Sequence, residues 1–419
     1  MITHPVLSEL ALAGVKLGLD EIRDFLGWIG HPERAFPAVH VAGTNGKGSV
    51  CTTVATALTA AGLRTGLNTS PHLEHVNERV RVDGVPIDDD ALDGLLRELD
   101  AARRAFGAAT GRSQAPLTYF ELTTALALVW FARQQVDVAV VEVGLGGRLD
   151  ATGVVRPAVS AVTGIGLDHV VELGPDLASI AREKAGIFRP GVPAVVGRVA
   201  PEAAEVLAEV AARVGTPLWW VDREVTVSRE PDGLVIATPR GRVGPVWPAL
   251  AGAHQEANAA VSVGVLHQLA AQGWALPDEA VVHGLAHGRI AGRLEELAPG
   301  LVVDGAHNVQ AAEALAAWLA SRPRTGRRLL LWGMGEDRDP REVVAPLLPH
   351  VDGVLTTRCA HPKARQADAL ALALQGLGPP VTAGGRVEEA LPRARAEADE
   401  VIVAGSLYLV GAVRALLGS

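Results

Sequence analysis

Lysine is scarce in this chain of 419 residues. Only four of its 38 basic residues are lysines, namely Lys16, Lys47, Lys184 and Lys363. Because the chain otherwise uses arginine for positive charge, a lysine indicates a position where a primary amine is needed. Lys47 and Lys184 fall within the motifs described below.

Other features are also rare, and each absence excludes a class of protein. The two cysteines, Cys51 and Cys359, provide neither a disulfide framework nor a metal cluster, which favours a reducing cytoplasm. Apolar runs such as 136–143 are too short to span a bilayer, so we expect no membrane partner. The first ten residues lack a basic segment, so we expect no secretory signal. The net charge of −9 and the absence of like-charge blocks argue against nucleic-acid binding.

What is present is the pattern of an α/β protein with two domains. Short β-branched runs alternate with helical stretches, which predicts largely parallel sheets. We expect a domain with a mainly parallel sheet over 1–291 and a smaller Rossmann-like α/β domain over 292–419. The strands predicted around the motifs are 38–42, 136–143, 158–165, 301–303, 328–332, 353–357 and 401–404. The helices predicted beside them include 48–61, 119–133, 177–185, 309–320, 341–348 and 407–417.

The first motif, His40-Val-Ala-Gly-Thr-Asn-Gly-Lys-Gly-Ser49, lies between a predicted strand and a predicted helix. Its glycines allow backbone N–H groups to face phosphate oxygens at a helix N-terminus. Lys47 can reach the terminal phosphates, and the Ser49 hydroxyl can bind Mg²⁺. The spacing differs from that of the common P-loop, and a glycine-rich structural turn is the alternative.

Two further motifs follow predicted strands. Glu142 ends an apolar strand, where a carboxylate is costly to bury unless it is paired or bound to a cation. It is therefore a candidate Mg²⁺ ligand, with a salt-bridged glutamate as the alternative. Asp168 and His169 follow the next strand, and a metal role is as probable there as a structural one.

Lys184 lies in the run Arg182-Glu-Lys184 on a predicted helix. Such a run more often forms a solvated face, but the scarcity of lysine favours a function. In the C-terminal part, Arg293 could clamp a phosphate or carboxylate, Asp304 could accept hydrogen bonds from ribose, and His307 could bind a substrate carboxylate.

Together these motifs resemble the folylpolyglutamate synthase/dihydrofolate synthase family of the Mur ligase superfamily. The resemblance runs through nearly the whole chain in the expected order. The segments that point to the folate branch are Thr69-Ser-Pro-His-Leu73, Thr118-Tyr-Phe-Glu121 and Gly405-Ser-Leu-Tyr408. Two departures are Gly153, where the family commonly has asparagine, and Arg338 in Asp337-Arg-Asp339, where the family has lysine.

The resemblance implies a cytoplasmic, monomeric ATP-dependent ligase. It assigns a P-loop-type ATPase domain that binds ATP and folate to 1–291, and a C-terminal glutamate-ligase domain to 292–419. ATP phosphorylates a substrate carboxylate, and the amine of L-glutamate attacks the acyl phosphate. The ATP-binding residues that it implies are Asn45, Gly46, Lys47, Gly48, Ser49, Asn258, Arg293 and Asp304. The metal ligands that it implies, for two Mg²⁺ ions, are Ser49, Ser70, Glu142, His169 and a carbamylated Lys184.

The same resemblance assigns the other substrates. Folate or dihydropteroate is expected to contact Thr118, Tyr119, Phe120, Glu121, Leu149, Asp150 and Ala151. His307 and Ser406 are expected to bind glutamate, and the implied catalytic residues are Lys47, Glu142, His169, Lys184 and His307. Two alternatives stay open: a ligase of the superfamily that acts on a cell-wall nucleotide precursor, and a nucleotide-gated binding protein without ligase activity.

Overall fold

The computed structural model describes residues 4–11, 18–112, 116–324, 326–336 and 338–418. Lys16 and Asp337 lie outside these ranges. The chain divides into two compact units, one formed by 1–249 and 255–289 and the other by 250–254 and 290–419. The functional assignment of the two predicted domains stays a prediction. None of the described helices is both long and apolar enough to cross a membrane.

The first unit is built on a sheet with the strand order β4-β3-β2-β5-β1-β6-β7-β8. In the stretch β2-β5-β1-β6-β7-β8, all neighbouring strands run parallel. At the edge of the sheet, β3 pairs antiparallel with β2, and β4 pairs antiparallel with β3. The strands are β1 Ala38–Ala42, β2 Thr65–Asn68, β3 Val80–Val82, β4 Val85–Pro86, β5 Val138–Glu142, β6 Pro157–Val162, β7 Ala194–Val196 and β8 Leu218–Trp220. A separate sheet holds β9 Thr226–Glu230, β10 Gly233–Thr238 and β11 Gly241–Val246.

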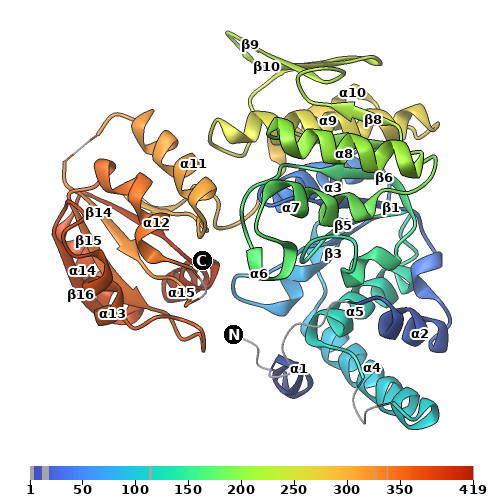
Figure 1. Cartoon of the computed structure of the whole chain (residues 1–419), viewed down its shortest axis with the longest axis horizontal. Coiled ribbons are helices and arrows are strands. Elements are labelled where there is room, and N and C mark those ends of the chain that lie inside the picture. Colours follow the sequence, from blue (N-terminus) through green and yellow to red (C-terminus); the bar gives the residue numbers. More distant parts are fainter. Residues whose placement is uncertain (1–3, 12–17, 113–115, 325, 337, 419) are drawn as a thin grey trace. The chain divides into compact units, whose positions relative to one another are not determined.

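Helices cover both faces of this larger sheet, as parallel strands buried on both sides require. One apolar core joins the sheet to α2, α4 and α5, and another joins its opposite face to α3, α9 and α10 (Figure 1). The helices of this unit are α1 Pro5–Ala11, α2 Asp20–Trp28, α3 Lys47–Ala60, α4 Asp89–Thr110, α5 Tyr119–Arg133, α6 Val170–Leu173, α7 Leu177–Lys184, α8 Pro201–Val214, α9 His254–Ala271 and α10 Asp278–His287.

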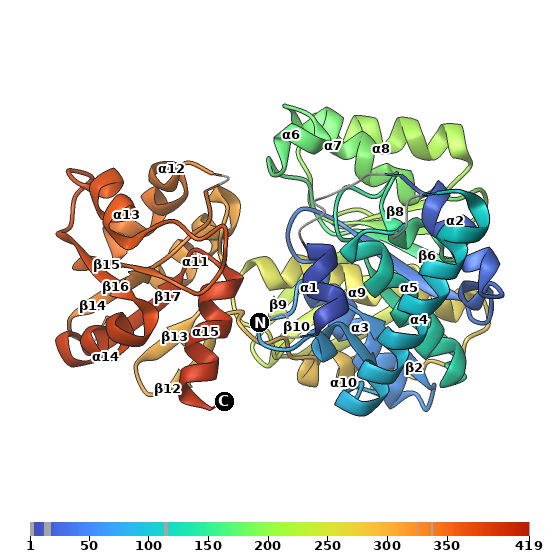
Figure 2. The same cartoon turned by 90° about the horizontal axis from the view of Figure 1, so that it is seen from below.

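The second unit has its own sheet, with the order β12-β13-β17-β14-β15-β16, and all but β12 run parallel. Figure 2 shows α12 and α13 on one side of these strands and α14 on the other. The strands are β12 Glu295–Ala298, β13 Leu301–Val303, β14 Arg328–Trp332, β15 Gly353–Arg358, β16 Val381–Arg386 and β17 Glu400–Ala404. The helices are α11 Val309–Ala320, α12 Pro340–Val344, α13 Ala367–Leu374, α14 Val387–Glu397 and α15 Leu407–Leu417.

Most predicted elements that flank the motifs are confirmed within a few residues, and three expectations need correction. The helix predicted over 341–348 is split into α12 and a 3-10 helix, Ala345–His350, which contains Pro346 and Pro349. Residues 224–239 alternate around an Asp232-Gly233 turn, which predicts a hairpin, and the structure adds a third strand, β11. Residues 62–118, to which the sequence analysis assigns no element, contain β2, β3, β4 and the long helix α4.

Candidate active site

The candidate active site of the first unit is formed at the carboxyl ends of four adjacent parallel strands. The strands lie in the order β2-β5-β1-β6, and each is followed by a segment that carries a sequence motif. Ser70 follows β2, Glu142 ends β5, the glycine-rich loop follows β1, and Asp168 with His169 follows β6. Ligands of open α/β sheets bind at this edge.

The glycine-rich loop has the backbone shape that its glycines predict. Gly43 has φ 152° and Gly46, which precedes α3, has φ 86°. The Lys47 ammonium donates hydrogen bonds to the carbonyl oxygens of Gly43 at 3.0 Å and Thr44 at 3.3 Å, so it lies across the loop. A Cβ atom on Gly46 would lie 2.3 Å from Oδ1 of Asn258, which places this predicted ATP residue of α9 directly against the loop.

Two threonines fasten this loop to the segment after β6. The Thr163 hydroxyl donates to the carbonyl oxygen of Asn45 at 2.6 Å. The Thr44 hydroxyl donates to the carbonyl oxygen of Gly166 at 3.1 Å and accepts from its N–H at 3.0 Å. The sequence analysis gives neither threonine a role, although Thr163 is a polar residue near the carboxyl end of the predicted strand 158–165, which was a usable signal.

Glu142 is buried, with 5% of its surface exposed, and it faces α3. Its Oε2 accepts the backbone N–H of Ser70 at 3.0 Å, which joins the segments after β2 and β5. Burial raises the pKa of the Cys51 thiol, and the Glu142 carboxylate raises it further, whereas Lys47 acts in the opposite direction. Glu142 and Lys47 are therefore both close to the first turns of α3, where Ser49 is also buried.

Asp168 and His169 differ in their surroundings. Asp168 is buried, and its Oδ1 accepts the backbone N–H of His169 at 2.9 Å. The His169 side chain is 44% exposed, and its Nε2 lies 3.9 Å from Oδ1 of Asp168. The exposed imidazole can therefore reach a ligand, and the carboxylate beside it can orient the ring.

Lys184 lies in the interior, so the solvated-face interpretation is wrong for this residue, although Arg182 of the same run is exposed. Only 4% of the surface of Lys184 is exposed, and its Nζ donates a hydrogen bond to the carbonyl oxygen of Gly43 at 2.9 Å. The neighbouring Glu183 pairs instead with Arg148, at 2.7 Å. Burial lowers the pKa of Lys184 to about 7, helped by the charge of Lys47 and opposed by Asp168 and Asp150.

The segment predicted to contact folate begins α5 with a capping box. The Thr118 hydroxyl and backbone N–H both donate to Oε2 of Glu121, at 2.9 and 2.8 Å. Glu121 is thus turned back onto its own helix and is 3% exposed. Phe120 packs on Gly144, where a Cβ atom would lie 2.4 Å from the ring. The segment therefore adjoins the loop after β5 through Phe120.

The other predicted folate segment includes Asp150, which is 3% exposed. Its Oδ2 accepts the backbone N–H of Leu145 at 2.8 Å, and its Oδ1 accepts that of Thr152 at 3.0 Å. Burial raises the pKa of Asp150, whereas these hydrogen bonds lower it. Asp150 thus organises the loop that contains Leu149 and Ala151.

In the second unit, the predicted residues also follow adjacent strands, β13 and β17. Asp304 is buried and accepts the backbone N–H groups of Leu294 at 2.9 Å and Ala306 at 2.8 Å. Burial raises its pKa, and nearby Arg293 opposes that shift. His307 Nδ1 lies 2.7 Å from the carbonyl oxygen of Gly305. Ser406 caps α15 by accepting the Tyr408 N–H at 3.2 Å.

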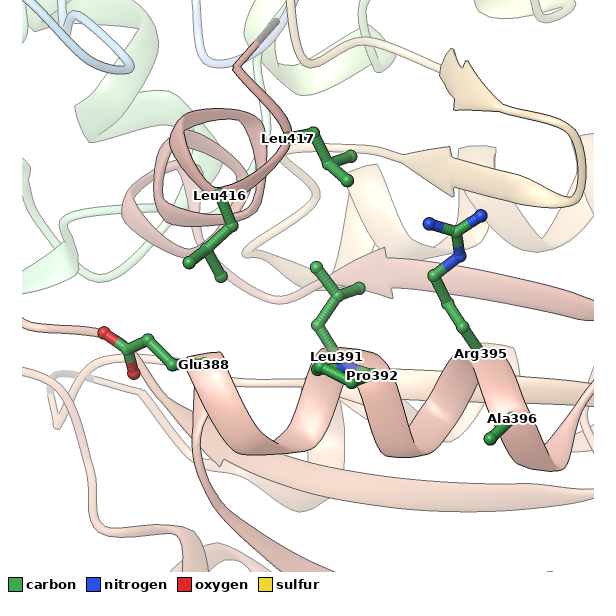
Figure 3. Close-up of a pocket in the computed structure, with 7 residues that line it drawn as sticks. All are labelled: Glu388, Leu391, Pro392, Arg395, Ala396, Leu416 and Leu417. Atoms are coloured by element: carbon green, nitrogen blue, oxygen red, sulfur yellow. The ribbon is translucent and has the colours of Figure 1, made fainter.

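A shallow pocket of about 490 Å³ also lies in the second unit, between α14 and the end of α15 (Figure 3). Glu388 and Arg395 flank its apolar centre, to which Leu391 and Leu416 contribute. None of its lining residues is a predicted site residue. This pocket therefore does not mark the candidate active site.

The oxygen donors of the first unit suit magnesium. Within the described ranges, no three His, Cys, Asp or Glu side chains form a group that could hold a metal by themselves. Mg²⁺ usually binds through one or two carboxylates, with water and substrate phosphates completing its shell. The buried Glu142 carboxylate and the Ser49 hydroxyl lie beside the glycine-rich loop of residues 43–48, which we call the phosphate-type loop. They fit a site in which the protein supplies only some of the ligands of Mg²⁺.

Comparisons with known proteins find relatives along nearly the whole chain. Residues 292–407 match the family described as Mur ligase, glutamate ligase domain. The dihydrofolate synthase/folylpolyglutamate synthase of Escherichia coli is 35% identical over 97% of this chain and 93% of its own length. The corresponding protein of Mycobacterium tuberculosis is 34% identical over 96% and 90%. The chain spans about half the length of a Haloferax volcanii relative, a probable bifunctional folylpolyglutamate synthase/dihydropteroate synthase, which is 36% identical.

Solved structures give the same result over almost the whole chain. E. coli FolC in complex with DHPP and ADP has a TM-score of 0.89 and 33% identity, covering 99% of this chain and 98% of its own. M. tuberculosis folylpolyglutamate synthase, complexed with ADP and AMPPCP, has a TM-score of 0.91 and 34% identity, with the same coverage. A Yersinia pestis enzyme complexed with AMPPNP and a manganese ion has a TM-score of 0.87 and 35% identity, covering 100% and 99%. The chain therefore belongs to the folylpolyglutamate synthase/dihydrofolate synthase family of the Mur ligase superfamily, whose members are ATP-dependent ligases.

Proposed function

We propose that this ligase is bifunctional: it adds L-glutamate to dihydropteroate and to the γ-carboxylate of tetrahydrofolate polyglutamates. One observation carries the proposal more than any other. Four adjacent strand ends carry Ser70, a buried carboxylate, a glycine-rich loop and an Asp-His pair at one edge of a sheet, and the buried Lys184 of α7 contacts the loop at Gly43. These groups match the needs of phosphoryl transfer to a carboxylate.

The reaction has two steps. A carboxylate oxygen of the folate substrate attacks the γ-phosphorus of ATP, and the bond to the ADP oxygen breaks. The amine of glutamate then attacks the acyl carbon, loses a proton, and displaces phosphate to leave an amide. Activation is needed because a carboxylate is a poor electrophile, and water must be excluded because it would hydrolyse the acyl phosphate.

The residues of the first unit divide this work. The N–H groups at the start of α3 and the Lys47 ammonium would bind and orient the phosphates. Mg²⁺ supplies charge neutralisation during phosphoryl transfer, and Ser49, Ser70, Glu142 and His169 are the side chains proposed to hold it. Asn258 adjoins the loop at Gly46, in a position suited to contacting the nucleotide.

Lys184 is proposed to be carbamylated and to ligate a second ion. The amine would attack the carbon of CO₂ and lose a proton, so that an anionic carbamate replaces an ammonium. Burial, which lowers the pKa of Lys184 to about 7, supports the proposal because only the neutral amine reacts. Arginine forms no such adduct, which accounts for a lysine in an arginine-rich chain.

The folate and glutamate assignments are also part of the proposal. Thr118–Glu121 and Leu149–Ala151 would line the pteridine pocket, and the packing of Phe120 on Gly144 supports their common location. Arg293 and Asp304 would contact ATP, and His307 and Ser406 would bind glutamate. Monomeric state and cytoplasmic location remain predictions.

A coupled assay tests the proposal. The purified protein would be given ATP, Mg²⁺ and L-glutamate with either dihydropteroate or tetrahydrofolate, and the products would be separated by chromatography. ADP release that requires both glutamate and each folate substrate is expected. Activity with only one of the two folate substrates would show that the enzyme is not bifunctional. Release of ADP without either substrate would favour the nucleotide-gated binding protein, and glutamate transfer to a nucleotide-linked sugar would favour a cell-wall ligase.

A further inference from the structure

A chain of buried polar groups runs from the centre of β1 to Asp150. His40 lies in β1, three residues before Gly43, and its side chain is fully buried. Its Nε2 lies 2.9 Å from the Thr152 hydroxyl oxygen. The Thr152 hydroxyl in turn donates to Oδ1 of Asp150. Neither His40 nor Thr152 has a role in the proposed reaction, and both are 0% exposed.

The directions of these hydrogen bonds follow from proton counting. The Thr152 hydroxyl has a single proton, which it donates to Asp150, so its oxygen accepts the second bond. His40 must then carry its proton on Nε2. Burial, together with the charge of Arg189, lowers the pKa of His40 to about 3, so the ring is neutral at physiological pH. Each group therefore donates to the next one in the same direction: the imidazole donates to the hydroxyl, and the hydroxyl donates to the carboxylate.

The loop that contains Asp150 is held from two sides. On one side, the chain of hydrogen bonds fastens it to β1, the strand that leads into the phosphate-type loop. On the other side, the Arg148 N–H donates to the carbonyl oxygen of Glu183 at 2.9 Å. Arg189 donates to the carbonyl oxygens of Gly153 at 3.1 Å and Gly186 at 2.8 Å. The loop thus lies between β1 and the end of α7, beside Lys184.

We infer that His40 and Thr152 are positioning residues that hold the loop 144–154, through Asp150, in the conformation that receives the pteridine. This inference rests on the proposed function, since it takes Leu149–Ala151 as part of the folate pocket. A positioning role explains why an imidazole occupies the interior of a strand whose other four residues are alanine and valine. It also explains how the Asp150 carboxylate is accommodated in the interior, because two backbone N–H groups and a hydroxyl donate hydrogen bonds to it.

The test compares substitutions that differ in one hydrogen bond. Thr152→Val removes the hydroxyl and keeps the shape, whereas Thr152→Ser keeps the hydroxyl. We expect Thr152→Val to raise the KM for dihydropteroate at least about tenfold, the effect of removing one hydrogen bond from Asp150 and leaving the buried His40 Nε2–H without its partner, while the KM for ATP changes less than about twofold. Thr152→Ser should restore most of the dihydropteroate affinity. Isothermal calorimetry with 7,8-dihydropteroate gives the same comparison without turnover.

A double variant tests whether the hydrogen bonds that join His40, Thr152 and Asp150 act as a unit. His40→Leu should weaken dihydropteroate binding, and His40→Leu with Thr152→Val should be no weaker than Thr152→Val alone. Ser160→Ala is the matched control, because Ser160 is equally buried, pairs in register with His40 and binds the carbonyl oxygen of Ile187 instead. This control should leave the KM for both substrates unchanged. Circular dichroism and the Tm of each variant identify loss of folding.

The outcomes separate this inference from the proposed function. If the wild-type protein transfers no glutamate to any folate, the proposed function is wrong. If the wild-type protein is active but Thr152→Val and Thr152→Ser bind dihydropteroate equally well, the positioning role is wrong and the ligase remains. An equal rise in the KM for ATP and for dihydropteroate would also overturn it, because that result indicates a general loss of structure.

Discussion

Burial of Lys184 predicts a lysine that reacts with CO₂ near neutral pH. Its pKa is lowered from 10.5 to about 7, chiefly by burial. At pH 7 about half of the amine is then neutral, which is roughly 1,500-fold more than for an ordinary lysine. We therefore expect one carbamate per chain when the protein is equilibrated with bicarbonate, and we expect it on Lys184.

Carbon NMR of the protein in ¹³C-bicarbonate measures the adduct. Lys184→Met should lose the carbamate signal, and Lys363→Met, which removes an exposed lysine, should retain it. Lys184→Met should also lose ligase activity, part of which a small carboxylate such as acetate restores. An unchanged signal in Lys184→Met, or full activity in Lys184→Arg, would refute the reasoning.

The same burial makes stability depend on pH in a predictable direction. The unfolded lysine binds its proton up to about pH 10.5, whereas the folded one releases it near pH 7. Between these values the unfolded state binds more protons, so the free energy of unfolding rises with pH. In CO₂-free buffer, we expect the wild type to gain about 2 kcal/mol more than Lys184→Met between roughly pH 7 and 9. Equal slopes in denaturant titrations would show that the amine titrates normally.

Three further predictions concern other groups. Glu142→Gln keeps the shape but removes the charge, so turnover should fall at least about a hundredfold while Tm changes little; a fall in Tm with turnover intact would instead indicate a salt-bridge role. A fragment of residues 1–290 should not ligate glutamate, because His307 and Ser406 lie beyond it; ligation at the full-length rate would exclude a two-domain mechanism. Lowering the pH from 7 to 5 should destabilise the wild type by about 2 kcal/mol more than His40→Leu. The reason is that the unfolded histidine binds a proton in this range, whereas the folded one, with a pKa of about 3, does not. Equal losses of stability in urea titrations would contradict this prediction.

The sequence predicted the fold well where local pattern decides it. The strand 38–42, the helix 119–133 and the helix 407–417 have the predicted bounds. Apolar runs and turn residues determine these elements without reference to distant residues. The amphipathic helix α4 could have been predicted from its Asp88 cap and its apolar spacing. The short strands β3 and β4 could not, because β3 depends on antiparallel pairing with β2, and β4 on antiparallel pairing with β3.

The candidate site was predictable only in part, because strand ends are visible in a sequence and contacts between loops are not. Glu142 and the phosphate-type loop stand directly after apolar runs, so their meeting at one sheet edge follows from parallel topology. The interior position of Lys184 does not, since its Arg-Glu-Lys run would suit a solvated helix equally well. What separates Lys184 from Glu183 is the contact of the helix with Gly43, a residue 141 positions away in the chain.

The same reasoning explains why His40 and Thr152 received no role from the sequence. His40 is visible as a polar residue inside an apolar strand, a position that is costly unless a partner satisfies it. Its partner lies 112 residues away in the chain. A buried polar residue in a strand therefore predicts that a partner exists, while the identity of that partner requires the fold. In this protein the partner, Thr152, binds Asp150, so an apparently structural histidine becomes a testable support of the loop proposed to bind folate.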